Sequence, residues 1–325
     1  MPSEKLASAE NLLKGNLASA WNILEGSSGD YTDLGIARRF GGAAAAYSLR
    51  DIGAMNGRVV RVRRDSDNTE EDFSANQVQN GVLEDFVGSG NDGFVTKWYD
   101  QSGNHRPMIQ SSTSEQPIIV ENGVFLGGVK ADAATSNDTM QNLQVSTDGT
   151  TPNFGTNSWA NGGTKLGLIY VGKVLSGTTS SNPAPFWGAG RGVSQFQTGA
   201  VSFQVIKGGN DSWRLVNERQ DLSPSSMTTS LTLNSDDDVI VTGTTDNRDF
   251  TLTVNASSAS ETESADLDVR ETTPISLFGA YDKNAGRYYQ RSAAGVCKEC
   301  YLYSGDNISE VATIATEINK HYNIY

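Results

Sequence analysis

The chain has 325 residues, of which 38 are acidic and 25 basic, so its formal net charge at pH 7 is -13. This acidic excess repels nucleic-acid phosphate and anionic membrane surfaces, and neither is an expected partner. No stretch approaches the ~20 consecutive apolar residues that a membrane helix needs, and the N-terminus lacks the basic and apolar segments of a secretion signal. We therefore expect a protein made in the cytoplasm, without a secretion signal and without membrane insertion.

Residues 1–42 are expected to form a helical segment followed by a linker. Spacings of seven, four, four and three separate its large apolar residues, which are Leu6, Leu13, Leu17, Trp21 and Leu24. These spacings predict one apolar stripe along a helix. The stripe either packs on the chain's own domain or forms a docking or oligomerisation arm ahead of a glycine-rich joint. Both interpretations stay open on the residues alone.

From about residue 43 the sequence changes to short β-rich runs separated by Gly, Asn, Asp, Ser and Thr clusters. The predicted runs are 58–64, 94–100, 116–128, 164–174, 200–207, 211–218, 238–255, 274–280 and 295–305. Hairpin turns are expected at 121–123 and 245–247. Such a series without intervening helical periodicity predicts two packed antiparallel sheets, an all-β sandwich over residues 43–325.

The last run, 309–325, returns to helical spacing, with Val311, Ile314, Ile318 and Tyr322 on one side. Ser309 is the expected N-cap. This pattern predicts a short C-terminal helix that packs against the sandwich.

The chain has two cysteines, Cys297 and Cys300, which lie three residues apart. On a regular strand they point to opposite faces, which is poor geometry for a disulfide. A single C-x-x-C in a chain with two histidines is weak evidence for zinc. We therefore expect two ordinary strand cysteines, no metal and no other cofactor.

An arginine-rich strand precedes an acidic run at residues 65–72. Strand alternation places Arg61 and Arg63 on one face. An inward arginine needs a partner, and Asp100 on a neighbouring strand is the expected one. The prediction is a buried ion pair that fixes strand register. The acidic run lacks the spacing of a calcium-binding loop and is expected to be a solvated loop.

The stretch FVTKWYDQSGN, residues 94–104, carries aromatic, carboxylate and amide side chains close together. Alternation places Phe94, Thr96 and Trp98 on one face and Lys97 with Tyr99 on the other. Because Lys97 marks the wetter face, Trp98 is expected in the core. Residues 100–103 have the composition of a β-turn.

Two interpretations of this stretch remain. In the structural one, Trp98, Tyr99, Asp100 and Gln101 form a corner of the scaffold. In the catalytic one, Asp100 is an acid or nucleophile and needs a second carboxylate about 5 to 9.5 Å away. The sequence supplies too many carboxylates to single out a partner.

Two further tryptophans are candidate ligand-binding residues. Trp159 and Trp187 lie in glycine-rich stretches, 157–163 and 184–192, that are expected to be loops. An exposed ring there would stack on a sugar, whereas a buried ring would plug the end of a sandwich.

Four segments occur in order: AAAYSLRDIG (44–53), RVVRVRRDSDNTEEDF (58–73), FVTKWYDQSGN (94–104) and QPIIVENG (116–123). Together they resemble the concanavalin A-like sandwich domain shared by α-L-arabinofuranosidase B catalytic domains and many virion proteins of tailed phages. The resemblance implies a lectin-like jelly roll. It carries over no catalytic residue, because the carboxylates of the arabinofuranosidases lie beyond these segments.

The resemblance leads to three hypotheses of function. The first is a structural virion protein of a tailed bacteriophage, a head decoration or fibre protein or a tail fibre or adaptor. Its N-terminal arm would dock to other virion proteins, its sandwich could bind host-surface glycans, and a homo-oligomer is expected. The second is a glycoside hydrolase of the α-L-arabinofuranosidase type. The third is an assembly protein that binds no ligand.

Overall fold

The structure is a computed structural model. It describes residues 42–53, 57–132, 141–146, 149, 165–176, 184–189, 200–206, 211–218, 229–262, 275–279, 281–282, 287–288 and 294–325. The chain divides into two units, Met1–Gly35 and Ile36–Tyr325, and the described residues belong to the second. The predicted helical stripe and Trp159 lie outside the described residues. Within the described part, no helix is long and apolar enough to cross a membrane.

Antiparallel strands dominate the described chain. They are β1 (Ala43–Ser48), β2 (Val60–Arg64), β3 (Glu70–Phe73), β4 (Gly93–Trp98), β5 (Met108–Ile109), β6 (Ile118–Glu121), β7 (Val124–Ala131), β8 (Leu143–Val145), β9 (Lys165–Val174), β10 (Ala184–Ala189), β11 (Ala200–Ile206), β12 (Ser212–Glu218), β13 (Thr229–Thr232), β14 (Val239–Asp246), β15 (Asp249–Val254), β16 (Ser257–Thr262), β17 (Ile275–Leu277), β18 (Tyr281–Asp282), β19 (Arg287–Tyr288) and β20 (Gly295–Ser304). The helices are α3 (Ala75–Gln79), α4 (Val82–Val87) and α5 (Val311–Tyr322), with 3-10 turns at Thr113–Glu115 and Gly305–Glu310. The predicted all-β class is confirmed.

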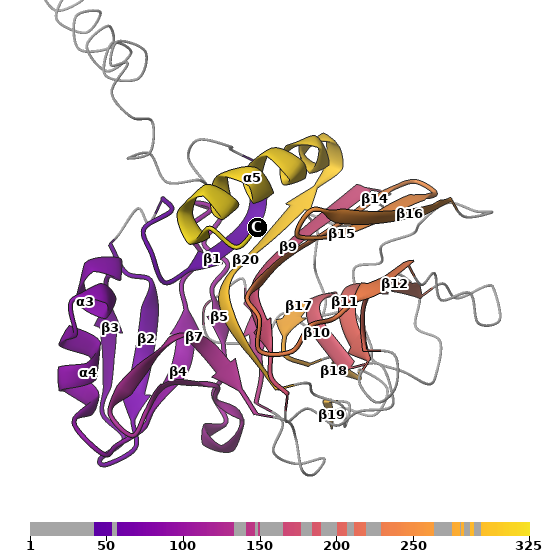
Figure 1. The fold of residues 1–325 in the computed structure, drawn as a ribbon. Coiled ribbons are helices and arrows are strands. Elements are labelled where there is room, and N and C mark those ends of the chain that lie inside the picture. The colour runs from indigo at the N-terminus through magenta and orange to yellow at the C-terminus, as the bar shows by residue number, and fades with distance from the viewer. Residues whose placement is uncertain are drawn as a thin grey trace, which may run out of the picture. The chain divides into compact units, whose positions relative to one another are not determined.

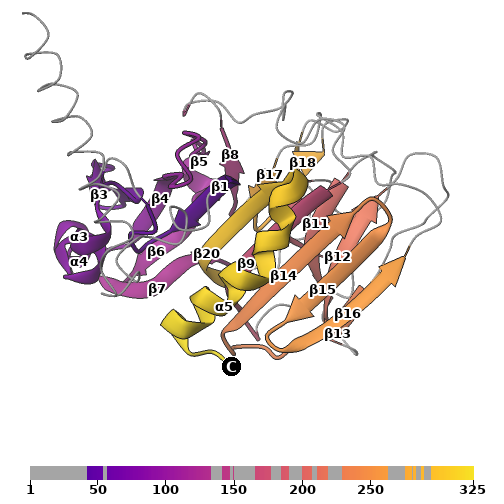
Figure 2. The ribbon, with the colours of Figure 1, turned by 90° about the horizontal axis from the view of Figure 1, so that it is seen from above.

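The described strands other than β18 and β19, which pair only with each other, form two runs that join into one sheet. Strand β20 pairs with β1, β7 and β9, and from β9 the run continues through β14, β15 and β16 (Figure 2). The second run is β13, β12, β11, β10, β17, β8, β5, β4, β2 and β3. Strand β6 links the two runs because it pairs with both β4 and β7. The sheet folds over on itself as a sandwich (Figure 1).

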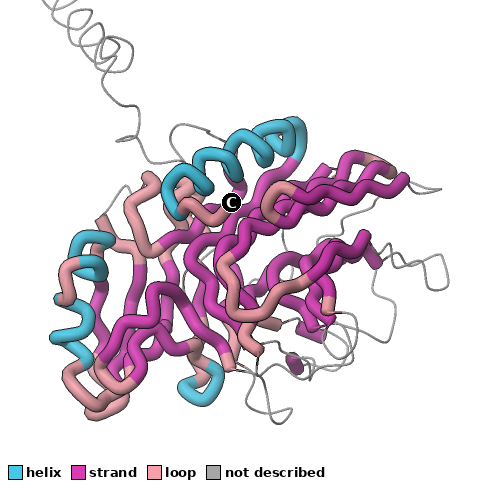
Figure 3. The backbone as a smooth tube through the Cα atoms, in the orientation of Figure 1, coloured by secondary structure: helices cyan, strands magenta, loops and turns pink. Residues whose placement is uncertain are grey.

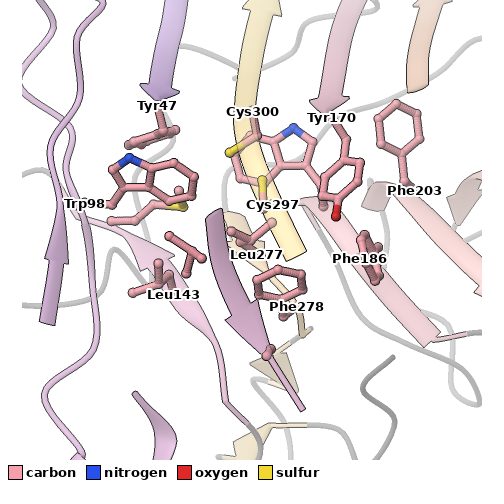
Figure 4. Packing of buried hydrophobic residues seen from close by; sticks show 14 of the residues in the cluster. Tyr47, Trp98, Leu143, Tyr170, Phe186, Phe203, Leu277, Phe278, Cys297 and Cys300 are labelled. Carbon is pink, nitrogen blue, oxygen red and sulfur yellow. The ribbon is translucent and has the colours of Figure 1, made fainter. Parts of the chain in front are cut away.

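Two apolar clusters hold the sandwich together. The larger one fills its interior and includes T-shaped aromatic contacts, such as Tyr170 against Phe186 with ring centroids 4.8 Å apart (Figure 4). The second lies on the opposite face of β9, β14 and β20, where Val311, Ile314 and Ile318 of α5 are buried (Figure 3). The sheet is therefore buried on both faces at β9 and β20, which explains their long apolar sequences.

The predicted hairpins are present. Asn122 and Gly123 connect β6 to β7 with φ values of 53° and 81°, the left-handed geometry that Asn-Gly favours. Strand β14 ends at Asp246 and β15 begins at Asp249, so the second turn is Asn247–Arg248 and lies slightly later than predicted.

Several predicted boundaries are wrong. Residues Glu70–Phe73 form strand β3 on the edge of β2, where a solvated loop was expected. The short helices α3 and α4 were not predicted. The C-terminal helix is confirmed, but it follows a 3-10 turn, and its N-cap is Glu310 without a side-chain bond. Ser309 Oγ donates to the carbonyl of Asp306 instead, so the expected capping role of Ser309 is wrong.

Both cysteines lie on strand β20, as expected, but a β-bulge overturns their predicted orientation to opposite faces. Opposite β9, the register passes from Cys297 directly to Glu299, so Lys298 is an extra residue. An extra residue resets side-chain alternation. Cys297 and Cys300 therefore both enter the same interior cluster, where both are free and fully buried (Figure 4). Burial raises the pKa of the Cys297 thiol well above its usual value, which makes it a structural rather than a reactive group.

Candidate functional site

Strand β4 also carries an extra residue, where it pairs with β2. The register passes from Val62 opposite Val95 to Arg61 opposite Lys97, which leaves Thr96 without a partner of its own on β2. This bulge again resets the alternation. Thr96 and Lys97 consequently lie together on the outer face of the sheet, the face turned away from the interior cluster, and both are half-buried.

The predicted core position of Trp98 is confirmed. Its side chain is fully buried, and its ring centroid lies 6.1 Å from that of Tyr47 (Figure 4). The predicted division of faces is wrong, because strict alternation put Thr96 on the same face as Trp98. The bulge separates them.

The chain after β4 forms a corner that holds β1. Asp100 Oδ1 accepts hydrogen bonds from the N–H groups of Ala46 and Ser102, both at 2.9 Å. Asp100 Oδ2 accepts from Ser102 Oγ at 2.9 Å and from the N–H of Arg106 at 3.0 Å. The Ser102 N–H bond closes an Asx turn in the stretch expected to be a β-turn. Both carboxylate oxygens are thus occupied by the scaffold.

Gln101 extends this corner toward the loop after β1. Its buried amide donates through Nε2 to the carbonyls of Ser48 and Arg50, at 2.8 and 3.1 Å. Its Oε1 accepts from the N–H of Ile52 at 2.9 Å. Its own N–H donates to the carbonyl of Ala46 at 2.8 Å. One side chain therefore satisfies three main-chain groups, which is the role of a structural residue.

A fully buried carboxylate, Glu299 on β20, connects the same region to α5. Arg50 forms an ion pair with it, and the hydroxyls of Tyr301 and Tyr322 donate to it at 2.6 and 2.9 Å. Ser48 Oγ also donates, at 2.9 Å. Burial alone would raise the pKa of Glu299, but the charge of Arg50 and these hydrogen bonds outweigh it and hold the pKa below its usual value. Glu299 is therefore a buried anion with a full set of donors.

The predicted ion pair to Asp100 is wrong. Arg61 forms a bidentate pair with Asp72, with Nε–Oδ1 and Nη2–Oδ2 distances of 2.7 and 2.9 Å. Arg63 is buried and donates from Nε to Gln116 Oε1 at 2.8 Å. The reason is that the corner already occupies the oxygens of Asp100, while an acidic strand and a buried amide lie closer to the arginines.

Asp72 gathers several donors on the outer face. Besides Arg61, the guanidinium of Arg58 and the hydroxyl of Tyr99 donate to it, at 2.9 and 2.7 Å. Burial works to raise the pKa of Asp72, but the bonds from Arg61 and Tyr99 outweigh it and lower the pKa. Burial and the bond to Asp72 raise the pKa of Tyr99. Tyr99 is therefore a structural partner here, as its place in the predicted corner implied.

Trp187 lies on β10, so its predicted position in a loop is wrong. The side chain is fully buried, and Nε1 donates to the carbonyl of Tyr301 at 3.1 Å. Its ring packs edge-on to Tyr47 with centroids 6.2 Å apart. No face of Trp187 is exposed for stacking on a sugar.

A polar pocket opens on the outer face of β2, β3 and β4, and we call it the outer pocket. Its volume is about 230 Å³. It is lined by Arg61, Glu70, Thr96, Lys97, Ile109, Gln110, Ser111, Gln116 and Gly149. The bulge in β4 places two of these residues, Thr96 and Lys97, side by side in the lining.

Buried amides form the polar part of the pocket wall. Gln116 accepts from Arg63 through Oε1 and donates through Nε2 to the carbonyl of Gln110 at 3.1 Å. Gln110 donates through Nε2 to Asn142 Oδ1 at 3.0 Å and accepts through Oε1 from the N–H of Ser112 at 3.0 Å. A connected polar network of this kind holds its members in one geometry. The wall is pre-organised in the absence of ligand.

The remaining lining residues carry charge or hydroxyl groups. Glu70 Oε2 accepts from Thr96 Oγ1 at 3.3 Å. Lys97 Nζ lies 5.8 Å from the ring centroid of Tyr99, which flanks the pocket. Glu70 is the one carboxylate among the nine lining residues that the structure describes. The pocket therefore presents cations, one anion and hydroxyl groups, which orient a polyhydroxyl ligand by hydrogen bonding.

Sequence reasoning missed this site. It used Lys97 only to mark the wetter face, and it singled out none of Gln110, Gln116 and Gly149. These residues come from separate segments, and no local motif connects them. No group of three or more His, Cys, Asp or Glu among the residues that the structure covers could hold a metal ion.

No protein-family model matches the chain, and no curated protein matches it either. Solved structures do share its fold. An arabinofuranosidase complexed with arabinofuranosyl-alpha-1,2-xylobiose has a TM-score of 0.55 at 14% identity, over 84% of this chain and 62% of that one. A GH54 α-L-arabinofuranosidase soaked with a cyclic sulfate inhibitor has a TM-score of 0.53 at 15% identity, with the same two coverages of 84% and 62%.

A Trypanosoma rangeli sialidase in complex with sialic acid has a TM-score of 0.42 at 15% identity, over 69% of this chain and 31% of that one. The chain spans less than two thirds of the length of the two arabinofuranosidases. The likeness to the two arabinofuranosidases, at 14% and 15% identity, establishes the sandwich fold alone. Activity and ligand have to be argued from the site.

Proposed function

We propose that this chain is a glycan-binding protein and that the outer pocket is its binding site. The observation that carries the proposal is the pocket itself, in which the buried amides of Gln110 and Gln116 line one wall beside charged and hydroxyl groups. The fold is consistent with it, because the similar arabinofuranosidase was solved with a bound oligosaccharide. The pocket's volume of about 230 Å³ suits one sugar unit, with the rest of a chain outside.

A glycan array probed with the full-length protein tests this proposal. We expect binding to a restricted set of glycans and loss of that binding in Gln116→Leu, which removes the wall's central amide. Gln79→Leu is the control, since Gln79 is exposed on α3 and does not line the pocket. The absence of binding to any glycan would contradict the proposal and favour an assembly protein without a ligand.

The biological setting of the proposal is the virion of a tailed phage. It is supported by the four ordered segments between residues 44 and 123 and by the apolar stripe in residues 1–42. In this setting the N-terminal segment attaches the protein to the particle and the sandwich presents the pocket to host glycans. Deleting residues 1–42 should abolish incorporation into particles, measured by immunoblot of purified virions. Unchanged incorporation would contradict attachment through this segment.

A second candidate function is glycoside hydrolysis, because the fold matches an arabinofuranosidase over 84% of this chain. Glu70 would supply one of the two carboxylates that hydrolysis needs, whereas Asp100 is held by four donors of the corner. This function predicts release of the aryl group from an aryl arabinofuranoside and its loss in Glu70→Gln. No turnover on a panel of such substrates would exclude it.

A further inference from the structure

We infer that the ligand of the outer pocket is an acidic saccharide, whose carboxylate binds between Lys97 and Arg61 and whose hydroxyl donates to Glu70. This inference rests on the proposed function, since it specifies the ligand class of the same pocket. The charges around the pocket determine this choice.

Lys97 has no anionic partner among the residues that the structure describes. Across the described chain, no carboxylate lies within ion-pair distance of its ammonium group, although Lys130, Lys165 and Lys298 each have one. A protein with a net charge of -13 has abundant carboxylates to pair with a lysine. The ammonium group therefore has its hydrogen-bond donors available to a ligand, and an anionic ligand gains most from them.

Arg61 offers a second set of donors beside Lys97. Its Nε and Nη2 are occupied by Asp72, and its side chain is 37% exposed. A guanidinium has five N–H donors in a fixed plane. The pair with Asp72 uses Nε and Nη2, so the N–H groups of Nη1 remain as donors for a ligand. The pair with Asp72 fixes the orientation of the plane. The two cations lie opposite each other on adjacent strands, where the Cβ atoms of directly opposed residues are about 5 Å apart.

Glu70 makes a bare anion a poor ligand. Its carboxylate also lines the pocket, and among the described residues it accepts from Thr96 Oγ1 through Oε2. A simple anion would be repelled by Glu70 and would leave Oε1 without a donor. A sugar that carries a carboxylate and neighbouring hydroxyls supplies an acceptor for the cations and a donor for Glu70. The pocket thus selects a hydroxylated acid.

Gly149 keeps the ammonium group accessible. Its φ is +73°, a conformation that favours glycine, and a Cβ built there would lie 3.5 Å from Lys97 Nζ. Its N–H donates to Ser146 Oγ at 2.9 Å, which fixes its position. A side chain at this position would therefore occupy the space in which the ligand's carboxylate is expected.

Isothermal titration calorimetry of the full-length protein tests the inference. The probes are a short oligogalacturonate and a neutral galacto-oligosaccharide of the same length. We expect the acidic sugar to bind at least about tenfold more tightly, and Lys97→Met to remove about tenfold of that affinity, as for a charge-assisted hydrogen bond. Gly149→Ala should weaken the same titration. Lys320→Met, on α5, is the control and should change nothing.

The outcomes separate the inference from the proposed function. Equal affinity for both sugars, unaffected by Lys97→Met, contradicts the acidic ligand and leaves glycan binding standing. No heat with either sugar, together with an empty glycan array, contradicts both. Acidic-sugar binding that survives Lys97→Met contradicts this pocket as the site. Unchanged thermal unfolding of the Lys97→Met protein shows that any loss of affinity comes from the pocket.

Discussion

The corner at residues 99–106 and the outer pocket use the same kinds of side chain and lie next to each other along the chain. In the corner, the carboxylate of Asp100 accepts from four donors of the protein, and the amide of Gln101 satisfies three main-chain groups. In the pocket, Lys97 has no ion-pair partner among the described residues. Residue type alone therefore does not separate scaffold from site. What distinguishes the two regions is whether the protein itself already supplies hydrogen-bond or ion-pair partners for their polar groups.

The corner is also continuous with the anchor of the C-terminal helix. Gln101 binds the carbonyls of Ser48 and Arg50, and the side chains of these same residues bind Glu299. Glu299 in turn accepts from Tyr322 on α5. The scaffold region should therefore respond to substitution with a large loss of stability, and the pocket with a loss of binding and little else.

The largest effect is expected for Glu299→Gln. This change leaves Arg50 buried without its counter-charge, and breaking such a pair costs about 3 to 5 kcal/mol. Urea unfolding followed by circular dichroism measures the free energy of unfolding. Glu71→Gln, at an exposed position on β3, is the matched control and should stay within about 0.5 kcal/mol of the parent. A Glu299→Gln protein as stable as its control would contradict the anchor.

The same carboxylate predicts a pH dependence. The folded-state pKa of Glu299 is lowered, so its contribution to stability is fully present above the unfolded pKa of about 4.3 and is lost as pH falls through the folded value. The difference in unfolding free energy between the parent and Glu299→Gln should therefore be constant above about pH 5 and shrink below it. A difference that grows on acidification would contradict the assigned direction.

Asp100→Asn should lower the free energy of unfolding by a smaller amount, about 2 to 3 kcal/mol. An amide cannot accept from all four donors of the corner, so partly buried N–H groups are left unpaired. The measurement is again urea unfolding. Asp237→Asn, at an exposed position, controls for the loss of charge. If Asp100→Asn left stability unchanged, the corner would not be a scaffold element.

Tyr99→Phe should lower the free energy of unfolding by less, about 1 kcal/mol. It removes one hydrogen bond to Asp72, while two arginines still bind that carboxylate. The ring beside Lys97 is retained, so sugar binding should persist. Thermal unfolding measures the stability of the variant, and calorimetric titration of the same preparation measures its affinity for the sugar. A loss of binding with full stability would move Tyr99 from the scaffold to the site.

Much of the fold was predictable from local patterns. The runs 58–64, 164–174 and 295–305 became β2, β9 and β20, since β-rich stretches between turn residues report strands directly. The bulges were not predictable. At Thr96 and at Lys298 one extra residue changes the face of everything that follows, and nothing in the local sequence marks an insertion that pairing with another strand creates.

The partners of the arginines were unpredictable for a related reason. Arg63 binds Gln116, a residue 53 positions away, and a buried amide in that role has no signature. Strand β10 begins the glycine-rich stretch 184–192, which has the composition of a loop, yet the strand is held by β11 and β17 on either side. The outer pocket combines both difficulties, because a bulge and long-range pairing bring its residues together.

The most direct test of the account is a calorimetric titration of the acidic oligosaccharide into two variants measured side by side. Asp100→Asn, studied where it is still folded, should lose stability and keep the affinity of the parent. Lys97→Met should keep its stability within about 0.5 kcal/mol and lose about tenfold in affinity. The reverse pattern, in which Asp100→Asn abolishes binding and Lys97→Met does not, would place the functional site in the corner and contradict the account.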